Sequence, residues 1–323
     1  MIKKIFKGYT IPLFLVLIIL IIISFGLGRY SIALNDLSSE ALIVLLKIRL
    51  PRILMAVLIG MALSAAGTSF QCVFHNQLAA PDILGASSGA CFGAALAILL
   101  GLSSFFITGF AFITSMLSIV LVYTVNKFAK GNQVIILLLA GIMIGSLFSS
   151  GTSFIKLVAD PNNTLPAITY WLLGSLSGTN INNLILAVFP IMSGILVLYL
   201  LRWRINVLTL PDDEIKSIGV NVKRLRLIII LCASLLTASA VSFGGMIGWV
   251  GLVIPNLSRR LVGNDTRKLL PTSVLLGGIF LLFVDDLSRT LLATEIPIGI
   301  LTAFIGAPFF IYLMIKKGGD SYS

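Results

Sequence analysis

The sequence predicts an all-α membrane protein with about ten transmembrane helices and both termini in the cytoplasm. Hydrophobic residues make up 58% of the 323 positions and charged residues only 11%, whereas soluble proteins carry about 25% charged residues. The apolar runs have the length of membrane-spanning helices and show no period-two alternation that would indicate β-strands. Lys and Arg gather between alternate runs, as in multi-pass proteins. We expect one membrane domain over residues 1–323.

Ten apolar segments account for the predicted helices. Helices satisfy their own backbone hydrogen bonds, as any structure surrounded by lipid must. The first segment follows a basic start like that of a signal peptide, but it is too long for one and lacks a cleavage site, so we expect it to be retained. The eighth is short. The segments are residues 11–28, 51–74, 83–100, 104–126, 134–158, 181–201, 225–243, 247–261, 270–292 and 297–315.

The positive charges orient these helices. If the N-terminus lies in the cytoplasm and direction alternates, 17 of the 23 Lys and Arg residues lie inside, which is the bias expected of cytoplasmic loops. The six placed outside are Arg29, Lys47, Arg49, Arg52, Lys156 and Arg289.

Three of these outer arginines stand out. Arg49 and Arg52 flank Pro51, and Arg289 follows Asp285 by four residues, so that last pair can meet on one helix face. Two interpretations stay open. The guanidinium groups could reach the lipid headgroups, or they could form a basic outer surface that receives an acidic partner.

Small residues recur at every fourth position in the third, fifth and tenth segments, which lets helix backbones approach closely in lipid. Close packing accounts for most of them. The fifth segment is also rich in hydroxyls, which either line a pathway or bond to their own helix backbone. The candidate pathway residues are Gly141, Gly145, Ser149 and Ser153 in the fifth segment and Gly299 and Ala303 in the tenth.

Residues 205–223 form a polar break between two apolar segments. Three acids begin a possible short helix there, where carboxylates suit the positive end of the helix dipole. A helix this short is marginal alone in water, so it would have to dock on another surface. The alternative is a solvated loop. The candidate docking residues are Pro211, Asp212, Asp213, Glu214, Ile215, Ile218 and Gly219.

Two further stretches are irregular. ITYWLLGSLSG is apolar but too short to span, so we expect it at the outer interface with Tyr170 and Trp171 as anchors. FGGMIGWVGLVIPNLSRR contains four glycines and Pro255, which predicts a broken or kinked start of the short eighth helix.

Several functions are disfavoured. The chain has one histidine, His75, and no catalytic motif or phosphate-binding loop, so we expect no enzyme, cofactor or ATP hydrolysis of its own. Its three cysteines lie in apolar runs and indicate neither disulfides nor a metal site. The net charge of +11 is scattered over helix ends, without the basic patch of a nucleic-acid-binding protein.

The energy source is predicted to lie outside the chain. An ion-coupled carrier would place ionisable groups near the middle of the membrane. The 12 acids lie in loops or near segment ends, with Asp285 and Asp286 the deepest. The polar break at residues 205–223 is therefore the expected docking site for a cytoplasmic motor.

The chain resembles permeases of the FecCD type, the membrane subunits of ABC importers for iron–siderophore complexes, haem and cobalamin. It departs from the family at Trp249, where Phe is usual, and at Asp286, an added acid. The matching stretches run from the second segment to the C-terminus and include RLPRILMAVLIGMALSAAGTSFQ, NQLAAPDILGASSGACFGA, ITYWLLGSLSG, DDEIKSIGVNVKRLR, GMIGWVGLVIPNLSRRLVG and DDLSRTLLATEIPIGILTAFIGAPFFIYLM.

The resemblance implies a permease in the cytoplasmic (inner) membrane of a prokaryote, paired with a second copy or a sister permease. Partners would be cytoplasmic ATPase subunits and an extracytoplasmic substrate-binding protein, besides membrane lipid. The favoured cargo is an iron–siderophore; haem, cobalamin or a molybdate-type oxyanion are alternatives. The rival class is an ion-coupled secondary transporter or a channel.

The resemblance also assigns roles to residues. It places the pathway at the interface between two permeases, along the fifth and tenth helices. Residues 211–219 correspond to the coupling helix that sits in a cleft of the ATPase. Arg49, Arg52 and Arg289 correspond to arginines that receive glutamates of the binding protein.

Overall fold

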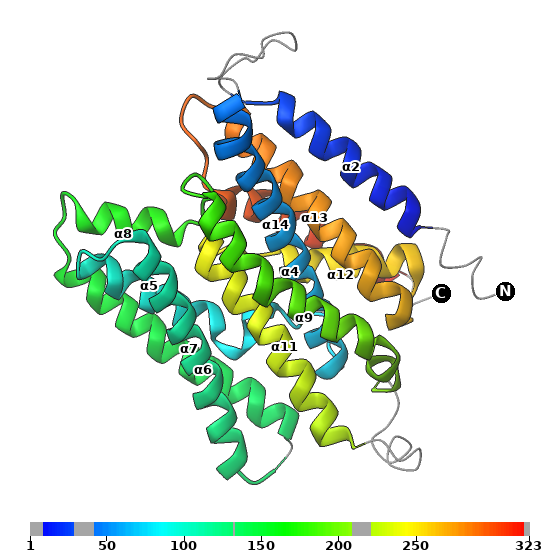
Figure 1. Cartoon of the computed structure of the whole chain (residues 1–323). Coiled ribbons are helices and arrows are strands. Elements are labelled where there is room, and N and C mark those ends of the chain that lie inside the picture. The colour runs from blue at the N-terminus through cyan, green and yellow to red at the C-terminus, as the bar shows by residue number, and fades with distance from the viewer. Residues whose placement is uncertain (1–8, 29–41, 132, 209–220, 320–323) are drawn as a thin grey trace.

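The computed structural model describes residues 9–28, 42–131, 133–208 and 221–319. These residues form helices joined by short loops, with no β-strand among them (Figure 1). The helices are α2 (Thr10–Gly26), the π-helix η1 (Val44–Arg49), α4 (Leu50–Val73), the 3-10 helix η2 (Pro81–Leu84), α5 (Ala86–Leu99), α6 (Ser104–Phe128), α7 (Gln133–Val158), α8 (Thr164–Leu172), α9 (Ile181–Val207), α11 (Val222–Gly244), α12 (Val250–Val262), α13 (Thr266–Thr290) and α14 (Ile298–Gly319).

The all-α prediction is confirmed, and each of the ten predicted segments coincides with an α-helix. Among the described residues, six helices are long and apolar enough to cross a membrane when η1 and α4 are counted together, and α2, α5 and α14 are shorter apolar helices. The chain is therefore a multi-pass membrane protein. The additional short helix α8 overlaps the stretch that was expected to lie at the interface.

Helix α4 is the axis of the bundle, buried on all sides and packed against α2, α9, α11, α12 and α13 (Figure 1). Small residues permit this packing. A Cβ added to Gly60 would lie 2.1 Å from the carbonyl oxygen of Gly277 on α13. A Cβ added to Gly67 would lie 1.9 Å from the carbonyl oxygen of Gly251 on α12. Such contacts replace the hydrophobic force that helices lack in lipid.

Helices α5 and α12 are about two thirds as long as the membrane requires. They contain 14 and 13 residues, or about 20 Å each, whereas the hydrocarbon core is about 30 Å thick. The first turn of α12 meets η2, the 3-10 helix just before α5, because a Cβ added to Gly251 would lie 2.1 Å from Cγ of Pro81. The predicted break before the eighth segment is confirmed, since α11 ends at Gly244 and α12 begins at Val250.

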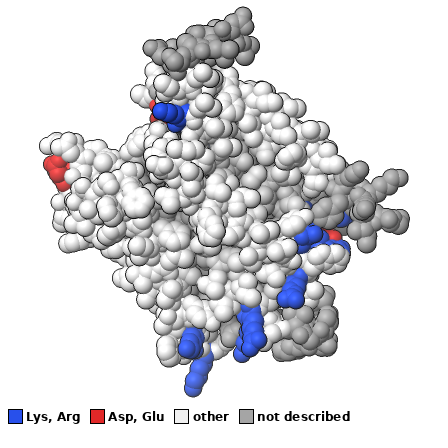
Figure 2. Space-filling model, viewed as in Figure 1, with Lys and Arg blue, Asp and Glu red and all other residues white. Residues whose placement is uncertain are grey.

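The charged side chains lie toward the ends of the molecule. On the visible face, most Lys and Arg gather along one edge, and the wide middle is uncharged (Figure 2). A smaller group of charges lies at the opposite end. The uncharged middle is the surface that lipid would cover.

We expect Gly60→Ala to destabilise the fold by about 1–3 kcal/mol, because the new methyl group forces α4 and α13 apart. The matched control is Gly109→Ala in α6, where an added Cβ meets nothing within 4 Å. That variant should be neutral or more stable by up to about 1 kcal/mol, since alanine favours helices. Thermal unfolding in detergent measures both. Equal melting temperatures would contradict the role given to the contact of α4 with α13.

Candidate functional site

An open cavity of about 830 Å³ lies between α7 and the segment that precedes α5. Gly141, Gly145, Ser149 and Ser153, the four pathway residues predicted on α7, all line it. The other lining residues are Leu78, Ala80, Asp82, Ile83, Gly85, Ser88, Ile142, Ser146 and Ser150.

Glycines on α7 bring this segment close. A Cβ added to Gly141 would lie 2.2 Å from the carbonyl oxygen of Ile83, and one added to Gly145 would lie 3.5 Å from Cα of Gly85. Gly85 itself has φ 72°, in the left-handed region that glycine adopts without strain. The segment before α5 therefore packs against the middle of α7.

The hydroxyls of α7 bond both to their own helix backbone and across to α5. Ser153 donates to the carbonyl oxygen of Ser149 at 3.0 Å, within its own helix. The Ser149 hydroxyl donates across to Oγ of Ser88 on α5 at 3.4 Å. Asp82 is the one charged residue in the described lining. Besides Asp82, the lining thus consists of small, apolar and hydroxyl side chains, and no described group of three or more His, Cys, Asp or Glu could hold a metal ion.

Gly299 and Ala303 lie on a different surface. Helix α14 packs against α12 and α13, whereas α7 packs against α5, α6 and η2. A Cβ added to Gly299 would lie 2.4 Å from the carbonyl oxygen of Leu173 and 2.7 Å from that of Met246. One chain therefore does not bring the two predicted groups of pathway residues into one cavity.

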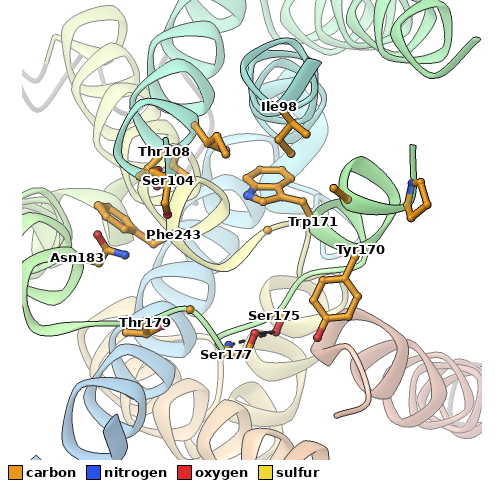
Figure 3. A pocket seen from close by; sticks show the side chains of 16 residues that line it. Ile98, Ser104, Thr108, Tyr170, Trp171, Ser175, Ser177, Thr179, Asn183 and Phe243 are labelled. Atoms are coloured by element: carbon orange, nitrogen blue, oxygen red, sulfur yellow. Dashed lines mark hydrogen bonds between the residues drawn. The ribbon is translucent and has the colours of Figure 1, made fainter. Parts of the chain in front are cut away.

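A second cavity of about 610 Å³ lies among the ends of α5, α6, α8, α9 and α11 (Figure 3). Trp171 and Tyr170 of α8 line it, and the Ser175 hydroxyl donates to Oγ of Ser177 at 3.0 Å. The sequence pattern predicts interface anchors at the two aromatic residues but does not predict this cavity. The density of Ser, Thr and Asn after α8 was the available signal.

The three outer arginines are buried: Arg49, Arg52 and Arg289 are 5%, 7% and 6% exposed. Arg52 Nε donates to Asp285 Oδ1 at 3.0 Å, and its Nη1 donates to Glu295 Oε1 at 2.8 Å. Arg289 Nε lies 3.2 Å from Asp285 Oδ2, which confirms the predicted pairing along α13. Arg289 also pairs with Asp286. These three arginines and three acids form the charged cluster.

The charged cluster joins three helices at one end of the bundle. Ser24 of α2 donates its hydroxyl to Asp286 of α13, and Arg49 donates to the carbonyl oxygen of Phe25. Arg289 donates to the carbonyl oxygen of Leu27 at 3.4 Å. Arg52 and Arg289 thus pair with acids inside the protein, and Arg49 binds a backbone carbonyl. Of these contacts, the sequence predicts the pair of Arg289 with Asp285 but not the others. Their contact with a binding protein stays a prediction.

The predicted coupling residues Pro211, Asp212, Asp213, Glu214, Ile215, Ile218 and Gly219 lie outside the described residues. Their docking role also stays a prediction.

We expect Asp285→Asn to cost about 3–5 kcal/mol of folding free energy, because it leaves two buried guanidinium groups short of a counter-charge. Glu295→Gln is the matched control. Its side chain is 22% exposed and, among the described residues, pairs with Arg52, so the loss of its charge should cost about 1 kcal/mol or less. Thermal unfolding of both variants tests the order. A larger loss of folding free energy for Glu295→Gln than for Asp285→Asn would show that Asp285 is not the central acid of the charged cluster.

Known proteins resemble this chain over most of its length. The model of the FecCD transport family matches residues 16–316. The molybdate import permease MolB of Haemophilus influenzae is 37% identical over 98% of this chain and 97% of its own length. A probable iron chelatin permease of Helicobacter pylori is 40% identical over 88% of this chain and 86% of its own.

A solved structure agrees with these sequence relatives. It is provisionally described as a metal-chelate type ABC transporter in an inward-facing conformation. Its chain superposes with a TM-score of 0.90 at 37% identity, covering 95% of this chain and 98% of that one. The chain therefore belongs to the FecCD transport family of ABC importer permeases.

Proposed function

We propose that the chain is the membrane-spanning subunit of an importer that carries a metal chelate, with an iron–siderophore as the favoured cargo, across the inner membrane by alternating access. It crosses the membrane ten times with both termini in the cytoplasm. It pairs with a second copy or a sister permease, takes energy from separate ATPase subunits and receives cargo from an extracytoplasmic binding protein. The cavity along α7 is the observation that carries this proposal.

The burial of acids supports an external energy source. Among the described residues, the buried acidic side chains are Asp285 and Asp286, and both pair with arginine near the end of α13. A coupling ion needs a carboxylate that is free to bind and release it. Apart from Asp82, which lines the cavity, the described part of the chain offers the rival ion-coupled carrier no such group inside the bundle.

The lining of the cavity supports a bulky chelate as cargo. A volume of about 830 Å³ falls within the range of roughly 300–1,000 Å³ that holds compounds of drug size. Asp82 in its lining would repel a small oxyanion. Molybdate remains the second candidate, because MolB is similar over nearly the whole chain.

The separation of α7 from α14 supports a dimeric pathway. Each helix presents exposed apolar side chains, such as Met143 at 70% and Phe304 at 75%. Across an interface between two permeases, Gly141, Gly145, Ser149 and Ser153 of one subunit could face Gly299 and Ala303 of the other. Residues 211–219 would occupy a cleft of the ATPase and transmit its movement.

Reconstitution in proteoliposomes with the ATPase and binding protein tests the proposal, with a labelled iron chelate and molybdate compared as cargo. Asp213→Lys with Glu214→Lys should lower uptake about tenfold or more while ATP hydrolysis persists, because reversed charge disfavours docking by several kcal/mol. The control is Asp160→Lys, just after the C-terminal end of α7, and this variant should transport normally. Uptake driven by an ion gradient without the ATPase would overturn the proposed function.

Docking through Arg49, Arg52 and Arg289 is tested separately by changing Glu295. The Glu295 carboxylate already accepts hydrogen bonds from Nη1 of Arg52. Glu295→Gln removes this competing carboxylate. Affinity for the binding protein should rise about fivefold at low salt, equivalent to ~1 kcal/mol, and the gain should shrink at high salt. Asp160→Asn is the control in the binding titration. An unchanged affinity would mean that the arginines act only inside the permease.

A further inference from the structure

Residues 245–249, here called the extended segment, run along α14 without regular structure. At one end the Met246 carbonyl oxygen lies 2.7 Å from the position of a Cβ on Gly299. At the other end Trp249 packs against Gly306, and its ring centroid lies 6.5 Å from that of Phe310. Gly306 follows Gly299 by seven positions in the helix, a rise of about 10 Å, so the segment descends by about that distance into the bundle.

The backbone of the extended segment is largely unpaired within the described chain. The N–H groups of residues 246–249 and the carbonyl groups of residues 246 and 247 have no hydrogen-bond partner among the described residues. The flanking groups do pair: Gly245 N–H donates to the Val241 oxygen at 2.8 Å. Each unpaired group costs several kcal/mol in hydrocarbon. These groups therefore require water, a polar solute or a polar protein surface.

One side of the extended segment is anchored and the other is open. Ile247 is 6% exposed, whereas Met246 is 48% exposed. Gly248 is exposed too, and a Cβ added to it meets nothing within 4 Å. Nearby exposed side chains of α14, such as Phe304 and Ile311, are apolar. A partner helix with similar side chains could not pair with the free backbone groups, because its own backbone is already bonded.

We propose that the extended segment lines the translocation pathway and offers main-chain hydrogen bonds to the cargo and its water. The proposal rests on the proposed function as an importer. The segment carries no charge, so it suits a chelate with its own oxygen donors and acceptors. Trp249 marks the deep end. Its φ of 68° is strained for a non-glycine residue, and packing against Gly306 and Phe310 holds it in place.

Thiol labelling of the full-length permease in membranes tests this proposal. Gly248→Cys is introduced after Cys72, Cys91 and Cys232 are replaced by alanine. Gly248 has no positive φ and has space for a side chain, so the variant should fold. Ser149→Cys on α7 is the pathway reference. Phe189→Cys, at an 80% exposed apolar position of α9, is the control, and N-ethylmaleimide verifies that each thiol can react.

We expect a charged, membrane-impermeant thiol reagent to label Gly248→Cys and Ser149→Cys at comparable rates and to leave Phe189→Cys unlabelled. If Gly248→Cys resists like the α9 control, a second subunit or lipid covers the segment and the proposal is overturned. Labelling of Ser149→Cys then tests the α7 pathway separately. Failure of the extended-segment proposal can therefore be distinguished from failure of the proposed function. Labelling of Gly248→Cys alone would support the extended segment and refute the α7 wall.

Discussion

Close contact between small residues is the constraint on which this fold depends, because lipid supplies no hydrophobic force to hold helices together. Helix α4 concentrates these contacts at Gly60 against Gly277 and at Gly67 against Gly251. The second contact also fixes where α12 begins. The packing axis and the starting point of the short helix α12 therefore share one surface, and any side chain larger than hydrogen there would separate them.

The charged cluster meets a second requirement of a membrane protein, which is that buried charges be paired. Arg52 and Arg289 pair there with the three carboxylates, and Arg49 donates to the carbonyl oxygen of Phe25. It connects α2, α4 and α13 at one end of the bundle. This pairing would let the arginines lie on the outer side predicted from the sequence, where positive charge is disfavoured. It also means that a docking partner has to compete with Glu295 for Arg52.

The breaks in the helices coincide with the two surfaces predicted to form the pathway. The segment before α5 packs against α7, where Gly141 and Gly145 admit its backbone. The extended segment packs against α14 at Gly299 and Gly306. Irregular backbone inside a membrane is tolerated where it borders water or is buried in protein. The short helices and the proposed hydrated passage would thus both follow from one architecture.

The amino-acid sequence alone determined the helix positions, the break before α12 and the family, because apolar run length, glycine clusters and motif order are local properties of the chain. It also indicated Gly141, Gly145, Ser149 and Ser153, since a small-residue stripe is visible within one helix. Tertiary structure decided the environment of Arg52, whose partner Asp285 is 233 positions away. It likewise placed Gly299 against Met246 and left α14 apart from α7. Such pairings depend on distance in space, which spacing along the chain does not specify.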